Sequence, residues 1–256
     1  GDQQLAWLSK ALGAIRSRGD SAILLGHIPP GPSHFELDSI CSPGHYYQVA
    51  GGACWDARSQ KRLLHLLAKY SDVLPASYWG HHHTDSVRIV GEDALRGAGG
   101  RSAAVVEGGS REPAVARHLC LLSPSLTPRN PPHDPAIRLY RYSRRTGAPI
   151  DFTEYRLDVD KANANGYAEW QRAPSALHTP PLNLKNMSAA EWARALRGML
   201  NHDHRPTSTD ELQPTDPFLK WVSAERCERE AYVESGSKMV PKLRKCKLAH
   251  LCAALH

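Results

Sequence analysis

The chain has 256 residues, of which 41% are hydrophobic and 23% charged, with 19 glycines and 19 prolines. This composition can bury a core, so it excludes collagen-like and disordered proteins and predicts one main core with an appendage. The longest apolar run, around residues 21–25, is far shorter than the roughly 18 residues that cross a bilayer, so we expect no transmembrane segment.

The net charge of the chain and its distribution limit the kinds of partner that it can bind. The formal net charge is +6 with the histidines neutral, and protonation of the 14 histidines in an acidic compartment would make the chain more basic. The few basic runs, at residues 144–145 and 242–247, have no interleaved aromatic residues that could stack on bases. We therefore expect no nucleic-acid polymer as a partner.

The six cysteines predict disulfide bonds in an oxidising compartment. They form no C-x-x-C pair, and three of them lie in the last thirty residues. Cys120 and Cys252 have no assigned partner, and the sequon at Asn186 is a candidate glycosylation site. We therefore expect a secreted, extracellular or lysosomal glycoprotein. The candidate disulfide residues are Cys41 with Cys54 and Cys227 with Cys246.

The first predicted elements lead into loops that contain histidines. Residues 3–18 have helical spacing and lead into the strand-like run AILL, which ends at GHIPPG. A long His/Ser/Pro/Gly-rich loop reaches about residue 53, and a helix over residues 62–70 follows. The strand-like run VLPASYWG then ends at GHHHTD. Two strands therefore each end in a histidine-bearing loop.

The later elements predict a small sheet and a helical tail. Residues 97–110 are glycine-rich without the spacing of a phosphate-binding loop, which favours a flexible hairpin tip. Helical patterns return from about residue 159 and are clearest over residues 189–200. The chain order predicts a mixed α/β (α+β) fold with a mostly helical C-terminal subdomain. The strands predicted between these regions cover residues 118–122, 137–142 and 150–157.

The two histidine loops predict one site, because ligands in layered α/β folds gather outside strand ends. In an extended segment residues i and i+2 point the same way, so we expect His81 and His83 to present two imidazoles on one face. Together with His27 and carboxylates, such a group suits zinc, iron or manganese. Asp85 is a candidate for orienting one of the imidazoles. A histidine-rich surface turn without metal is the alternative interpretation.

A family resemblance is carried by the motifs GHIPPG and GHHHTD, by AKYSDV between them, and by SPSLTP, AIRLYRY and KCKLAHLC after them. In this order they resemble the C-terminal half of the acid sphingomyelinase-like phosphodiesterases, within the calcineurin-like metallophosphoesterases. The resemblance implies part of an αββα catalytic sandwich over residues 1–157 and a mostly helical, disulfide-containing subdomain over residues 158–256. His82 stands where the family has Thr or Ser between its two ligand histidines.

The same resemblance implies two zinc ions, with His27 and His81 on one and His83 on the other. Metal-activated hydroxide would hydrolyse a phosphodiester, either a sphingomyelin-like lipid or a nucleotide-type ester. The resemblance places the family's D-x-H loop, bridging Asp and Asn-His pair in the upstream half, which this chain does not match, and three side chains cannot complete two zinc sites. We therefore expect an upstream half as its partner and no activity from this chain alone. The alternative is a truncated, non-catalytic paralogue that acts as a binding module or weak zinc site.

Overall fold

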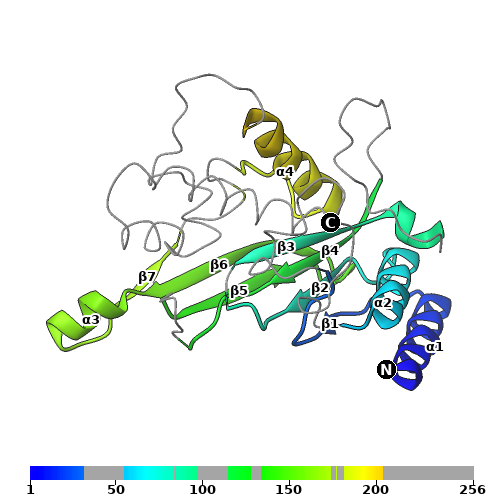
Figure 1. The fold of residues 1–256 in the computed structure, drawn as a ribbon, viewed down its shortest axis with the longest axis horizontal. Coiled ribbons are helices and arrows are strands. Elements are labelled where there is room, and N and C mark those ends of the chain that lie inside the picture. Colours follow the sequence, from blue (N-terminus) through cyan, green and yellow to red (C-terminus); the bar gives the residue numbers. More distant parts are fainter. Residues whose placement is uncertain are drawn as a thin grey trace.

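The computed structural model describes residues 1–31, 55–83, 85–96, 115–127, 134–173, 177 and 182–203. None of the helices in these ranges is long and apolar enough to cross a membrane. In chain order the elements are α1 (Asp2–Arg18), β1 (Leu24–Leu25), α2 (Ala57–Lys69), β2 (Ala76–Trp79), β3 (Ser86–Gly91), the 3-10 helix η2 (Glu92–Arg96), β4 (Ala116–Leu122), β5 (Ala136–Tyr142), β6 (Pro149–Leu157), α3 (Val159–Asn165), β7 (Trp170–Arg172) and α4 (Ala189–Asp203) (Figure 1).

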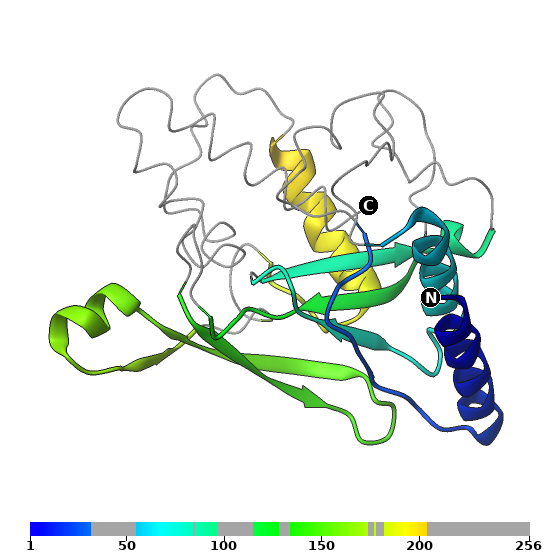
Figure 2. The same ribbon diagram turned by 60° about the horizontal axis from the view of Figure 1, so that its bottom comes forward.

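The strands form two sheets. In the first, the order is β1-β2-β4-β3, with β1, β2 and β4 parallel and β3 antiparallel to β4. The second sheet is antiparallel, in the order β5-β6-β7, and α3 extends with β7 away from α1 and α2 (Figures 1 and 2). Because β1, β2 and β4 are parallel, their carboxyl ends lie at the same edge of the first sheet.

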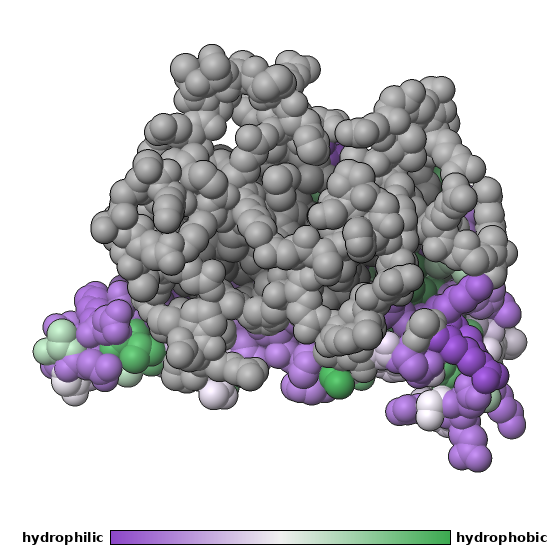
Figure 3. Space-filling model, in the orientation of Figure 1, coloured by the Kyte–Doolittle hydropathy of each residue, from purple (hydrophilic) through white to green (hydrophobic). Residues whose placement is uncertain are grey.

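Helices α1 and α2 cover one face of the first sheet. Leu5 and Leu12 of α1 join Leu67 of α2 in a buried cluster that also contains Cys120 and Leu122 of β4. The outer surface of α1, at the lower right of Figure 3, is mostly hydrophilic. This division of polar and apolar residues explains why the periodicity over residues 3–18 predicted a surface helix correctly.

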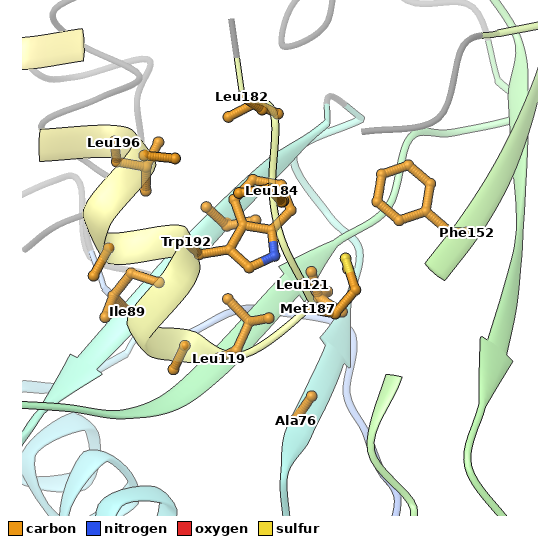
Figure 4. Close-up of a cluster of buried hydrophobic side chains, with 14 residues drawn as sticks. Ala76, Ile89, Leu119, Leu121, Phe152, Leu182, Leu184, Met187, Trp192 and Leu196 are labelled. Carbon is orange, nitrogen blue, oxygen red and sulfur yellow. The ribbon is translucent and has the colours of Figure 1, made fainter. Parts of the chain in front are cut away.

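The opposite face of the first sheet packs against α4 and the second sheet. Side chains alternate along β4, so Leu119 and Leu121 point away from α1 and α2. Trp192 of α4 is fully buried among these leucines and Leu184, and Phe152 of β6 belongs to the same cluster (Figure 4). Both faces of the first sheet are therefore buried, which fits the continuous apolar runs of β2 and β4.

The mixed α/β content confirms the predicted fold class at that level. The helices and five of the strands lie where the sequence predicts them, whereas β3, β7 and η2 were not predicted. Residues 182–196 pack on the same cluster as Leu119 and Leu121, so the core continues across the expected boundary at residue 157. The division into two domains and the αββα sandwich stay predictions.

Several expectations fall on residues that the structure does not describe. The long loop up to residue 53 and the hairpin tip at residues 97–110 lie outside the described ranges. Cys120 is described, and it is a buried free thiol. The disulfides therefore stay predictions, and the cysteines that lie outside the described residues are Cys41, Cys54, Cys227, Cys246 and Cys252.

Candidate functional site

The candidate site lies at the carboxyl edge of the first sheet, where three loops begin. His27 follows β1, residues 80–83 follow β2, and Ser123 follows β4. Backbone hydrogen bonds join these loops beyond the strands, because the Gly80 N–H donates to the His27 carbonyl at 3.0 Å and the Ser123 N–H donates to the Trp79 carbonyl at 2.9 Å. The sheet thus fixes where each histidine loop starts.

Glycine is required before His27 for a steric reason. A Cβ atom added to Gly26 would lie 2.2 Å from Cζ3 of Trp79, which is too close for any side chain. Trp79 is itself buried, and its indole N–H donates to Ser77 Oγ at 2.7 Å. The ring therefore cannot move away, and the Gly-His pair of the first motif follows from close packing of the β1 loop on β2.

Helix α2 holds the rest of the first histidine loop. The Trp55 indole N–H, one residue before the Asp56 cap of α2, donates to the Ile28 carbonyl at 3.2 Å. The Gly31 N–H donates to Gln60 Oε1 at 3.1 Å. The sequence does not predict these contacts, since neither Trp55 nor Gln60 lies in a recognisable motif.

His27 and His81 come together as the two strand ends predict. Their ring centroids are 5.2 Å apart and the rings are nearly perpendicular, at 77°. Two imidazoles on one tetrahedral zinc ion place their centroids about 5 Å apart, so the spacing of this pair fits a shared ion. Among the described residues no group of three or more His, Cys, Asp or Glu side chains is arranged to hold a metal. The structure therefore supplies a fitting pair, and a complete metal site needs further ligands.

The expectation that His81 and His83 share one face of an extended segment is wrong. Both have a left-handed backbone, with φ of 70° and 60°, and the His82 N–H donates back to the Gly80 carbonyl at 2.8 Å. The segment is a turn, so the two-residue alternation of a strand does not apply. His82 is buried, and burial, followed by the charges of Arg88 and the neighbouring histidines, lowers the pKa of His82 to about 3.

Asp85 closes the second histidine loop with buried ion pairs. One carboxylate oxygen accepts from Arg138, and the other accepts from Arg156 at 2.7 Å. Burial raises the pKa of Asp85, whereas the charges of Arg138 and Arg156 outweigh burial and lower the pKa of Glu154, which shares both arginines. Asp85 thus contacts Arg138, Arg156 and Glu154 of the second sheet, where the sequence led us to expect an imidazole.

The sequence did not predict a role for Arg138, Glu154 and Arg156. Their only signal was charge at alternate positions of two predicted strands. Asn186, the candidate glycosylation residue, is exposed, and its side-chain oxygen accepts from the Ser188 N–H at 2.9 Å. Its modification stays a prediction.

No protein-family model matches the chain. Curated proteins similar to it include acid sphingomyelinase-like phosphodiesterase 3b of Homo sapiens, 25% identical over 66% of this chain and 32% of that protein. Sphingomyelin phosphodiesterase B of Dictyostelium discoideum is 25% identical over 76% of this chain and 25% of that protein. Cyclic GMP-AMP phosphodiesterase SMPDL3A of Homo sapiens is 25% identical over 66% of this chain and 31% of that protein.

The chain thus spans a quarter to a third of the length of these relatives. The matches cover most of the chain, and the sequence motifs of the histidine loops had pointed to the same family. Over most of its length the chain is therefore similar to acid sphingomyelinase-like phosphodiesterases.

Proposed function

We propose that this chain forms one part of the catalytic centre of a secreted or lysosomal, zinc-dependent phosphodiesterase. The observation that carries the proposal is the meeting of His27 and His81, 5.2 Å apart, at the edge where β1 and β2 end. In the proposal these two imidazoles bind one zinc ion and His83 binds a second. Bound zinc supplies a Lewis acid for the phosphoryl oxygen and an activated water at neutral or mildly acidic pH.

The chain's own contribution is to hold the imidazoles ready for metal. The hydrogen bond from Gly80 to the His27 carbonyl ties the two histidine loops together, so a displacement of one loop displaces the other. Gly26 and Trp79 fix the height of the first loop above the sheet. Such pre-arranged ligands reduce the entropy lost when the metal binds.

The substrate class is a phosphodiester of lipid or nucleotide type. Among the relatives, one name specifies sphingomyelin and another cyclic GMP-AMP, and both substrates contain a phosphodiester bond. Zinc requires about four ligands per ion, so the three histidines here need further ligands from elsewhere in the complete protein. We therefore expect this chain by itself to be inactive and the upstream half found in the family to complete the site.

The test is metal content and hydrolysis in the complete natural protein. We expect bound zinc, hydrolysis of bis(p-nitrophenyl) phosphate that a chelator abolishes, and a loss of roughly 100-fold or more in His27→Ala and His81→Ala. His65→Ala is the matched control, because His65 lies on α2 and contacts the Ala94 carbonyl at 3.2 Å, away from the strand ends.

Retention of zinc and activity in both ligand variants would contradict the proposal. Zinc binding without hydrolysis of any phosphodiester would favour the non-catalytic binding module instead. If hydrolysis occurs, sphingomyelin vesicles and a cyclic dinucleotide compared at equal concentration separate the lipid from the nucleotide substrate.

A further inference from the structure

A buried cluster of four charged side chains lies beside the second histidine loop. Arg138 pairs with Asp85 and with Glu154, the latter at 2.8 Å, and Arg156 pairs with Asp85 at 2.7 Å and with Glu154. The side chains of Asp85, Arg138 and Glu154 are at most 2% exposed, and that of Arg156 is 20% exposed. The cluster thus brings two guanidinium groups together with two carboxyl groups, and Asp85 and Glu154 also contact each other.

The members of the cluster come from distant parts of the chain. Asp85 lies two residues after His83 and directly before β3 of the first sheet. Arg138 stands opposite Glu154 in the pairing of β5 with β6, and Arg156 lies two residues further along β6. Asp85 is therefore the one carboxylate of the cluster that the histidine loop contributes, and both of its oxygens are held by the second sheet.

Arg138 also connects the cluster to the end of β4. Its guanidinium donates to the Leu122 carbonyl at 3.3 Å and to the Tyr140 hydroxyl at 3.2 Å, and it lies 4.1 Å from the centroid of the Phe152 ring. The Tyr140 hydroxyl in turn contacts Ser123 Oγ at 3.2 Å, at the start of the loop after β4. One arginine thus touches both the histidine loop and the neighbouring strand end.

The histidine loop needs contacts that hold it in place, because its backbone conformation is unfavourable. His81 and His83 both have positive φ, a conformation that persists in non-glycine residues only where the surroundings enforce it. At its start the loop is tied by the bond from Gly80 to the His27 carbonyl, and at its end by Asp85. A buried carboxylate cannot leave two arginines without a large desolvation penalty, so Asp85 is a firm end point.

We propose that Asp85 is a positioning residue, through which Arg138 and Arg156 of the second sheet hold His81 and His83 in place for the metal. The second sheet then sets the geometry of a site to which it contributes no ligand of its own. This inference rests on the proposed function in so far as the imidazoles bind zinc.

The test compares Asp85→Asn with Glu154→Gln in the complete natural protein. Both variants replace by an amide one carboxyl group that pairs with the same two arginines, but only Asp85 belongs to the histidine loop. We expect Asp85→Asn to weaken zinc binding by about 10- to 100-fold, measured by competition with a chromogenic chelator, and Glu154→Gln to weaken it by less than about threefold. In the metal-free protein, hydrogen exchange at the Gly80 and His82 amides should accelerate in Asp85→Asn more than in Glu154→Gln.

Equal effects of the two variants on zinc affinity and on amide exchange would overturn the proposal, since the cluster would then be only structural. If Asp85→Asn does not fold, Arg156→Gln removes one donor through a partly exposed side chain and is expected to give the same pattern in weaker form. A wild-type protein that binds no zinc refutes the proposed function instead, and the exchange comparison then still decides whether Asp85 holds the loop.

Discussion

Two buried polar groups in this molecule differ in kind. On the side of the first sheet that faces α1 and α2, His118 contacts the Leu74 carbonyl and Ser77 Oγ, each at 2.9 Å, and Trp79 donates to the same Ser77 oxygen at 2.7 Å. All of these groups are uncharged, because burial lowers the pKa of His118 to about 4. The other group is the cluster of Asp85 with Arg138, Glu154 and Arg156, in which each carboxyl group pairs with both guanidinium groups.

The difference lies in what each group connects. The Leu74 carbonyl only accepts, so His118 Nδ1 carries the proton and Nε2 accepts from the Ser77 hydroxyl, which links β2 to β4 within one sheet. The ionic cluster links two sheets and ends at the histidine loop. Burying neutral groups that hydrogen-bond to each other has a small desolvation penalty. Burying charged groups has a large one, so we expect buried charges where they fix the position of other parts of the chain.

The largest expected effect follows from removing one cation of the ionic cluster. Arg138→Met keeps much of the side-chain volume but leaves two buried carboxylates with Arg156 alone. We expect the free energy of unfolding to fall by about 3–5 kcal/mol, measured by urea denaturation. Adding Asp85→Asn to Arg138→Met rebalances the charge and should recover part of the loss. A loss below about 1 kcal/mol, or no recovery in the double variant, would show that buried charge is not what distinguishes the cluster.

Strands β2 and β4 were predictable because they are apolar on both sides, but the expectation that β4 shares one small sheet with β5 and β6 is wrong, since β4 lies between β2 and β3. The runs that became β2 and β4 contain residues such as Leu119 and Leu121 with no exposed surface, so local hydrophobicity was sufficient. Strand β3 was missed although it alternates Val87, Arg88 and Ile89, because a buried arginine interrupts the apolar pattern. The pairing of β3 with β4 is long-range and leaves no mark in a local window.

The site was predictable in part for the same reason. The meeting of His27 with His81 follows from two parallel strands that end at one edge. The cluster was not predictable, because Ile137 and Leu139 of β5 are 38% and 58% exposed while Arg138 between them is buried. A pattern argument places the apolar residues inside, and here the charges lie inside because distant partners neutralise them.

A smaller change in the free energy of unfolding is expected from the neutral group of His118, Ser77 and Trp79, and this change depends on pH. The ordinary pKa of histidine is 6.5, and burial lowers that of His118 to about 4 in the folded protein. Above pH 6.5 the imidazole is neutral in both states. As the pH falls toward 4, only the unfolded chain binds the proton, so the free energy of unfolding decreases by about 2 kcal/mol between pH 7 and pH 5 through this residue.

His118→Gln isolates this contribution. The glutamine oxygen can still accept from Ser77, but it does not titrate, so the stability difference between wild type and variant should shrink by about 2 kcal/mol from pH 7 to pH 5. Urea denaturation at both pH values measures it. A difference that stays constant with pH would mean that the folded protein protonates His118 as readily as the unfolded chain does, and the neutral character of this group would not hold.

The smallest effect is expected from an arginine on the same strand as Arg138. Arg141 pairs with Asp151 at 3.2 Å, but its side chain is 71% exposed, so water solvates the guanidinium whether or not the pair forms. Arg141→Met should change the free energy of unfolding by less than about 1 kcal/mol, and 1 M salt should abolish the change because exposed charges are then screened beyond about 3 Å. Both arginines lie on β5 and both pair with a carboxylate of β6, so burial is the main difference between them. If Arg141→Met destabilised the protein as much as Arg138→Met, the pairing of β5 with β6 would explain both losses, and burial of the charges beside the histidine loop would not.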